Sequence, residues 1–190
     1  VSIGSYAGMA NGGGYNVNIG FRAGSTTTGN SNVTIGNDAM RFLNAGNENV
    51  AIGASAGSYL LGTQTTIVGS QAGRFASGSY NTFMGYKAGY GSLTSAPYSS
   101  GTSNTAVGYQ ALTAFTTGAA NVAVGRHAFK ALTTANYGVA IGYDAAPAVT
   151  TANAVIAIGN SAAKAVTEGS DNIAIGQNTI RNITTDTSNV

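Results

Sequence analysis

Five of the eight basic residues occupy one repeated place in the sequence, because each lies five positions after a glycine. A stripe of cations on one surface is a candidate site for an anionic glycan or for the phosphates of lipopolysaccharide. The alternative is structural, since long cationic side chains also cover apolar corners and pair with carboxylates of a neighbouring repeat or chain, such as Glu48, Glu168 or Asp171. The five basic residues are Arg41, Arg74, Lys130, Lys164 and Arg181.

Tyr90 and Tyr98 are further candidates for surface binding, because they lie in the segment that interrupts the regular glycine spacing, residues 90–103. Loops on a rigid scaffold often carry recognition residues, and tyrosine is a favoured contact residue. An insertion of this kind is also tolerated without any function, since a longer surface loop costs little entropy. The sequence leaves both interpretations open.

Catalytic and metal chemistry is not predicted for this chain. His127 is the only histidine and there is no cysteine, so a transition-metal site lacks a second ligand of either type. A Ser-His-Asp triad would need His127 buried against a carboxylate. The sequence places none there, and His127 is expected to be a solvated side chain. We therefore expect a protein that is not an enzyme and that holds no cofactor.

The composition excludes several classes of partner. Charged residues make up 7% of the chain, and the formal net charge is +2. Binding to nucleic acid relies on many phosphate contacts, so this small charge argues against it. No apolar run is long enough to cross a bilayer, so this segment is not expected to insert into a membrane directly. A hydrophobic content of 43% is nevertheless too high for a disordered chain.

The elements that must position these side chains come from an internal repeat of 16 or 17 residues, found in eleven copies. Each copy ends a short apolar stretch with a glycine, which is counted here as position 0. Glycine adopts positive φ readily, so it is expected to turn the chain after a strand. The turn glycines are Gly4, Gly20, Gly36, Gly53, Gly69, Gly85, Gly108, Gly125, Gly142, Gly159 and Gly176.

Positions −3 and −1 carry β-branched or other apolar residues in every copy, which predicts a short strand with these two side chains in the core. Position −2, alanine in six copies, is then expected to point outward and to pack against another chain. Position +3 is alanine in ten copies. A repeat this short, without helical periodicity, predicts an all-β parallel β-solenoid of eleven 16–17-residue coils.

Position −4 is asparagine in seven copies. Asparagines stacked at one corner of successive coils can hydrogen-bond to the residues above and below, as in cross-β ladders. Asparagine is also a common turn residue, but its fixed place in the repeat favours a ladder. The predicted ladder residues are Asn16, Asn32, Asn49, Asn81, Asn104, Asn121 and Asn172. Because the chain starts and stops inside a motif, residues 1–190 are expected to be one repeat segment of a longer fibre, with an inserted loop at 90–103.

The stretch Asn104–Leu112, with the sequence NTAVGYQAL, resembles the repeats of bacteriophage tail fibres, particularly those that end in an intramolecular chaperone. The related Asn49–Gly53, Asn121–Gly125 and Asn172–Gly176 are similar to the head repeats of trimeric autotransporter adhesins. Both resemblances imply a homotrimer outside the cell, either in a virion tail fibre or on a bacterial surface. The adhesin heads also imply a left-handed parallel β-roll.

The resemblance and the repeat together predict a structural and adhesive fibre segment, with a phage tail fibre for attachment to the host surface as the first interpretation. Its partners would be two further copies of itself and a glycan or protein receptor on the host. A bacterial trimeric surface adhesin is the alternative. A second alternative is an ice-binding solenoid, because threonine doublets recur at one place in the repeat, at 27–28, 116–117, 133–134, 150–151 and 184–185.

Overall fold

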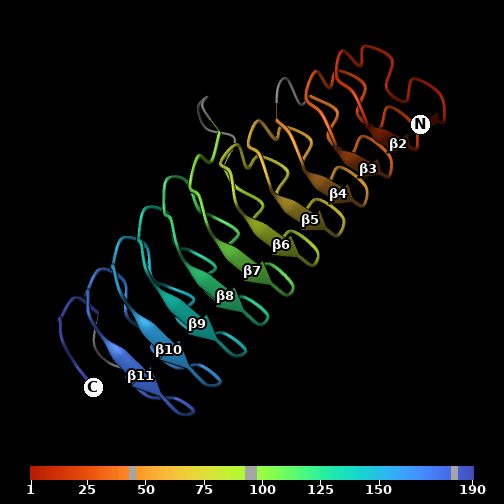
Figure 1. Ribbon diagram of the computed structural model, residues 1–190. Helices are drawn as coiled ribbons and strands as arrows, with labels where there is room; N and C mark the ends of the chain where they lie inside the picture. Colours follow the sequence, from red (N-terminus) through yellow and green to blue (C-terminus); the bar gives the residue numbers. More distant parts are fainter. Residues whose placement is uncertain (43–45, 93–97, 181–183) are drawn as a thin grey trace.

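The computed structural model describes residues 1–42, 46–92, 98–180 and 184–190, and within these residues it is an all-β parallel solenoid without a helix (Figure 1). One eleven-stranded sheet runs the length of the molecule, with its strands in sequence order. Each strand ends directly before a repeat glycine, as predicted. The strands are β1 (Ser2–Ile3), β2 (Val17–Ile19), β3 (Val33–Ile35), β4 (Val50–Ile52), β5 (Thr66–Val68), β6 (Thr82–Met84), β7 (Thr105–Val107), β8 (Val122–Val124), β9 (Val139–Ile141), β10 (Ile156–Ile158) and β11 (Ile173–Ile175).

The coils stack into a rod, with the N-terminus at one end and the C-terminus at the other (Figure 1). Strands pair in parallel so that equivalent repeat positions are partners, for example Val122 with Val139. The longer sixth coil keeps this register, because Thr82 pairs with Thr105 and Met84 with Val107 across the insertion. The insertion therefore leaves the sheet unbroken.

The direction of the strand side chains is the reverse of the predicted one. Position −2 is buried in ten of the eleven copies, as for Ala123 and Phe83, which are fully buried. Positions −3 and −1 point outward instead, and Ile141 and Ile175 are 39% and 64% exposed. Hydropathy could not reveal this, because both faces are apolar in most strands and the buried position −2 is even polar in β2 and β3, at Asn18 and Thr34. The space inside the coil decides it, since the inward residue must fit against the opposite wall.

That opposite wall follows each turn glycine and carries buried side chains at positions +3, +4 and +7. The alanines at +3 from Ala23 to Ala162 are buried, and so are Leu132 and Val149 at +7. The wall lies directly across the core from the sheet, because a Cβ added to Gly57 at position +4 would lie 3.0 Å from the side chain of Ile67 at position −2. The core is thus a thin layer between the sheet and this second wall.

The repeat glycines turn the chain with positive φ and also let the coils stack closely. Gly53, for example, has φ of +133°, and a Cβ on it would lie 2.6 Å from the carbonyl of Gly69 in the next coil. An L-residue would suffer both backbone strain and a clash with main-chain atoms that cannot move aside.

The asparagines at position −4 are buried and bind main chain in the neighbouring coils. The side-chain carbonyl of Asn104 accepts hydrogen bonds from the backbone N–H of Asn121 at 3.0 Å and from its side-chain amide at 3.1 Å. The amide of Asn121 also donates to the carbonyl of Ala135 at 2.8 Å. Most of the bonds in this column therefore join side chain to backbone, so each asparagine ties its own coil to both neighbours.

Candidate functional site: an arginine and aromatic groove

The basic residues at position +5 lie on the wall that faces the sheet across the core. Backbone hydrogen bonds join neighbouring coils along this wall. Tyr59 N–H donates to the carbonyl of Arg74 at 3.0 Å, and Ala114 N–H donates to that of Lys130 at 3.2 Å. Arg41 and Arg74 are partly buried, whereas Lys130 and Lys164 are exposed. Arg181 falls outside the described residues.

The ion pairs of the stripe differ from those considered in the sequence. Arg41 lies 3.7 Å from Asp38 of its own coil, an acid not considered for this role. Glu48 accepts a hydrogen bond from Gln64 at 2.9 Å. Across the described ranges, no carboxylate lies within 4.0 Å of the cationic groups of Arg74, Lys130 or Lys164.

Aromatic side chains at position +6 stack along the same wall beside the two arginines. The ring of Tyr59 lies 4.8 Å from that of Phe42 and 5.2 Å from that of Phe75, with both pairs stacked. The guanidinium of Arg41 sits 4.6 Å from the centre of the Phe42 ring, and that of Arg74 sits 5.2 Å from that of Phe75. These contacts are cation–π interactions, which hold the arginines over the rings.

Both tyrosines of the insertion join this aromatic column. The ring of Tyr98 lies 5.0 Å from that of Tyr59, and the ring of Tyr90 contacts Phe75 edge-on at 5.1 Å. Ser77 donates a hydrogen bond to the carbonyl of Tyr98 at 3.1 Å, and Ser99 forms a parallel bridge with Ala76. Both ends of the insertion are therefore built into the solenoid, and its middle, residues 93–97, lies outside the described residues.

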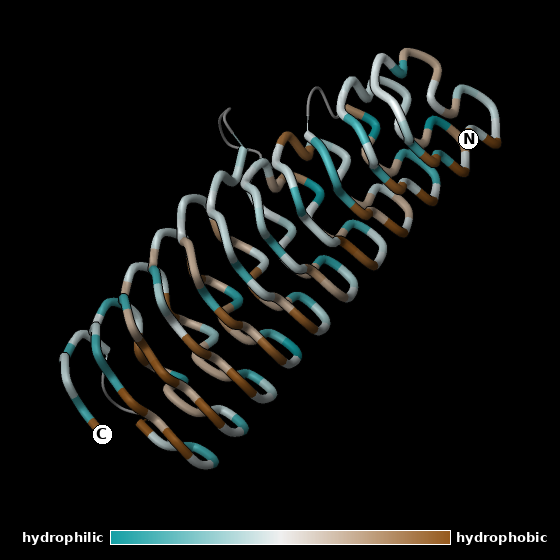
Figure 2. The backbone as a smooth tube through the Cα atoms, in the orientation of Figure 1, coloured by the Kyte–Doolittle hydropathy of each residue, from teal (hydrophilic) through white to brown (hydrophobic). Residues whose placement is uncertain are grey.

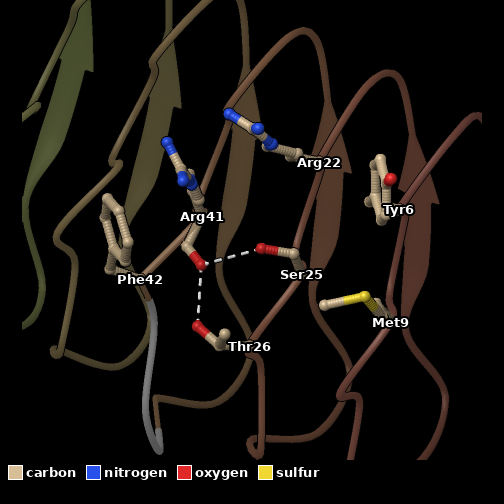
Figure 3. A pocket seen from close by; sticks show the side chains of 7 residues that line it. All are labelled: Tyr6, Met9, Arg22, Ser25, Thr26, Arg41 and Phe42. Atoms are coloured by element: carbon tan, nitrogen blue, oxygen red, sulfur yellow. Dashed lines mark hydrogen bonds between the residues drawn. The ribbon is translucent and has the colours of Figure 1, made fainter.

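Two adjoining hollows follow this wall near the N-terminal end of the rod. The first, of about 280 Å³, lies between Tyr6, Met9, Arg22, Ser25, Thr26, Arg41 and Phe42 (Figure 3). The second, of about 390 Å³, lies between Thr26, Phe42, Tyr59, Leu61 and Tyr98. Because the hollows share Thr26 and Phe42, we treat them as one feature, the arginine–aromatic groove.

Hydrogen bonds hold the floor of this groove in place. Thr26 donates from Oγ1 to the carbonyl of Arg41 at 2.7 Å, and Ser25 donates to the same carbonyl at 3.3 Å (Figure 3). The guanidinium of Arg22 lies 4.6 Å from the centre of the Phe21 ring. In Figure 3 the side chains of Arg22 and Arg41 extend along the same side of the groove.

His127 is not the solvated side chain predicted from the sequence. Its Nδ1 lies 3.0 Å from Oδ1 of Asp144, the equivalent residue of the next coil, and both side chains are largely shielded from solvent. The stacking of equivalent positions brings the two together, although 17 residues separate them. No serine or threonine hydroxyl bonds to His127 in the described part of the chain, so no catalytic triad is assembled there.

In the doublets that begin at Thr116, Thr133 and Thr150, the first hydroxyl is used within the fold. Thr116 donates to the carbonyl of Thr133 at 3.0 Å, and Thr133 donates to that of Thr150 at 3.1 Å. The second residues of these doublets, Thr117, Thr134 and Thr151, are exposed. An ice-binding surface would have to rely on this second column.

The described part of the chain shows neither a candidate metal cluster nor a helix that could span a membrane. No group of three or more His, Cys, Asp or Glu side chains is arranged there to hold a metal ion. No helix of sufficient length and apolarity to cross a bilayer occurs there.

The stacking rings Phe42 and Tyr59 and the guanidinium of Arg22 were not among the residues singled out from the sequence. The available signal was an aromatic residue at position +6 in three consecutive copies, Phe42, Tyr59 and Phe75. Arg22 lies at position +2, and only the stacking of coils brings it near Arg41. Comparison with known proteins gave no match to a family model, to a curated protein or to a solved structure.

Proposed function

We propose that this chain is a segment of a homotrimeric fibre, and that the fibre is a phage tail fibre that attaches to the host surface. The observation that carries the proposal is the outer face of the sheet. Position −1 is apolar in all eleven strands and position −3 is valine or isoleucine in eight copies and threonine in three, so together they form the brown band of Figure 2. Among them Ile52, Met84 and Ile141 remain 37%, 47% and 39% exposed.

An apolar face of this length is a poor surface for a soluble monomer, because large contiguous apolar patches mark sites of association. A second and a third copy of the same chain are suitable partners, since every coil offers the same two rows at the same spacing. Three chains arranged symmetrically around an axis parallel to the rods would cover this face on every chain. No further chain could then add through it. The resemblance of residues 104–112 to tail-fibre repeats supports three copies and the attachment role.

Assembly is tested by the mass of the full chain in solution, measured by light scattering during gel filtration. We expect about three times 18.8 kDa for the natural chain and a single chain for the double variant Ile52→Asp/Ile141→Asp. The matched control is Tyr80→Asp/Tyr137→Asp, at positions 58% and 73% exposed and outside the strands, which should keep the trimer. A monomeric natural chain would overturn the proposal, and a two-chain mass would overturn the trimer.

Attachment is tested with the labelled full chain on intact cells. A tail-fibre segment that performs attachment should bind bacterial cells and lose binding after removal of envelope glycans or proteins. Binding confined to animal cells or matrix proteins would instead indicate the bacterial adhesin. If the chain bound neither bacterial cells nor animal cells or matrix proteins, the attachment role would be overturned. The segment would then serve only as a spacer between other parts of the fibre.

A further inference from the structure

We propose that the arginine–aromatic groove binds a carboxylated saccharide chain. This deepens the proposed attachment function, on which it rests, by naming the site and the chemical class of the receptor. The groove combines two kinds of group that such a ligand needs, cations for its carboxylates and aromatic faces for its sugar rings. It also lies on the wall across the core from the apolar sheet face, so assembly through that face would leave it open.

The cations of the groove are available to a ligand. Arg22 has no carboxylate within 4.0 Å in the described part of the chain, and Arg41 has only Asp38, at 3.7 Å. Both guanidinium groups are already positioned by a ring, Phe21 or Phe42, which lowers the entropy lost on binding. A guanidinium can donate two parallel hydrogen bonds to one carboxylate.

The aromatic surface continues from the arginines along the rod. Phe42 is 36% exposed and Tyr6 is 55% exposed, and Tyr59 and Tyr98 extend the lining of the second hollow. The C–H faces of sugar rings stack on such aromatic faces. Successive coils rise by about 4.8 Å, which is close to the length of one sugar ring in an extended chain. An extended saccharide can therefore follow the groove from coil to coil.

The charge of the groove favours carboxylate over phosphate. Moving a dianionic phosphate from water into the groove, beside Met9, Phe42 and Leu61, costs more free energy than moving a singly charged carboxylate. The reason is that the desolvation penalty grows steeply with charge. Asp38 beside Arg41 adds a negative charge that repels a dianion more strongly. We therefore expect uronic-acid type saccharides to be preferred to phosphorylated ones.

Calorimetric titration of the full chain with tetragalacturonate tests the proposal, with maltotetraose as an uncharged tetrasaccharide and glucose 1-phosphate as the phosphorylated sugar. We expect saturable binding of tetragalacturonate that weakens with added salt, and at least tenfold weaker binding of the other two. Binding should fall at least tenfold in Arg22→Gln/Arg41→Gln and in Phe42→Ala. Failure of the natural chain to bind tetragalacturonate, or stronger binding of glucose 1-phosphate, would overturn the proposal.

The matched control is Lys130→Gln/Lys164→Gln. It removes the same amount of charge from the same wall, in coils that have alanine and not a ring at position +6. Its affinity for tetragalacturonate should lie within about twofold of that of the natural chain, because the variant loses only a small long-range electrostatic attraction. Equal losses in the two double variants would show a general cation effect and overturn the groove as the site. The monomeric variant Ile52→Asp/Ile141→Asp separates the two proposals, because it should retain saccharide binding whether or not the natural chain is trimeric.

Discussion

Two neighbouring pairs of coils, those of β5 and β6 and those of β7 and β8, fill the same thin core from opposite sides. In the coils of β5 and β6, position −2 on the sheet carries Ile67 and Phe83, and position +4 on the facing wall is glycine. In the coils of β7 and β8, position −2 is alanine, and the facing wall supplies Leu112 and Phe129. All four large side chains are fully buried. In these four coils the large side chain is therefore supplied first by the sheet and then by the facing wall.

The exchange follows from close packing. A Cβ on Gly89 would lie 2.5 Å from Cγ of Phe83, and a Cβ on Gly73 would lie 2.7 Å from Cδ1 of Ile67. A wall residue larger than glycine has no room opposite a large sheet residue. Where the sheet residue is alanine, Leu112 and Phe129 fit even at φ of 51° and 47°, which an L-residue adopts only at a cost.

The largest effect is expected from giving the coil of β6 the wall residue of the coil of β7. Gly89→Leu places a side chain into the Phe83 ring and should lower the free energy of unfolding by about 4 kcal/mol, or prevent folding. Phe83→Ala leaves a cavity and should cost about 3 kcal/mol. The double variant Phe83→Ala/Gly89→Leu should recover most of the loss, because it recreates the arrangement of β7. Denaturant unfolding followed by circular dichroism measures all three, and losses that simply add would contradict the exchange of volume.

The strand positions and the solenoid were predictable from the repeat, because a glycine and two apolar positions at a fixed spacing define each turn and strand. The inward face was not predictable from hydropathy. Val122 and Val124 alternate with Ala123, and all three are apolar, so alternation alone does not distinguish core from surface. The small residue lies inside because the wall supplies Phe129 opposite it, and this contact depends on the stacking of coils.

The groove was predictable only in part for the same reason. The position of Arg41 and Tyr98 in the sequence suggested surface binding, but their separation of 57 residues gave no sign that one column of rings connects them. Tyr59 makes that connection, through Phe42 on one side and Tyr98 on the other. Such long-range contacts arise from stacking and cannot be read from a single repeat.

An intermediate effect is expected from the asparagine column, which both halves share. Asn49→Ala leaves the N–H of Thr65 and the carbonyl of Gly62 without their partner, and Asn121→Ala does the same to Gly138 and Ala135. Each should lower the free energy of unfolding by about 2 to 3 kcal/mol, because buried polar groups lose their hydrogen bonds. Similar losses would show that the backbone frame is common to both halves although their cores differ. Asn136→Ala, as control, removes inter-coil hydrogen bonds at a half-buried, solvent-accessible place and should cost less than about 1 kcal/mol. A loss confined to one half would contradict a common frame.

The smallest effect is expected at position +6, where three coils of the N-terminal half have rings and four coils of the C-terminal half have alanine. Tyr59→Ala removes contacts with Phe42, Phe75 and Tyr98 and should lower the free energy of unfolding by about 1.5 kcal/mol, because aromatic pairs contribute modestly at a partly exposed site. It should also speed chymotrypsin cleavage after Tyr98, mapped by mass spectrometry, since that ring loses its main support. Ala131→Tyr, the matched change in the C-terminal half, should alter stability by less than about 0.5 kcal/mol because no ring lies beside it in its own column. Unchanged cleavage in Tyr59→Ala would show that Ser77 and Ser99 alone hold the insertion, and that the aromatic column shapes the groove without securing the loop.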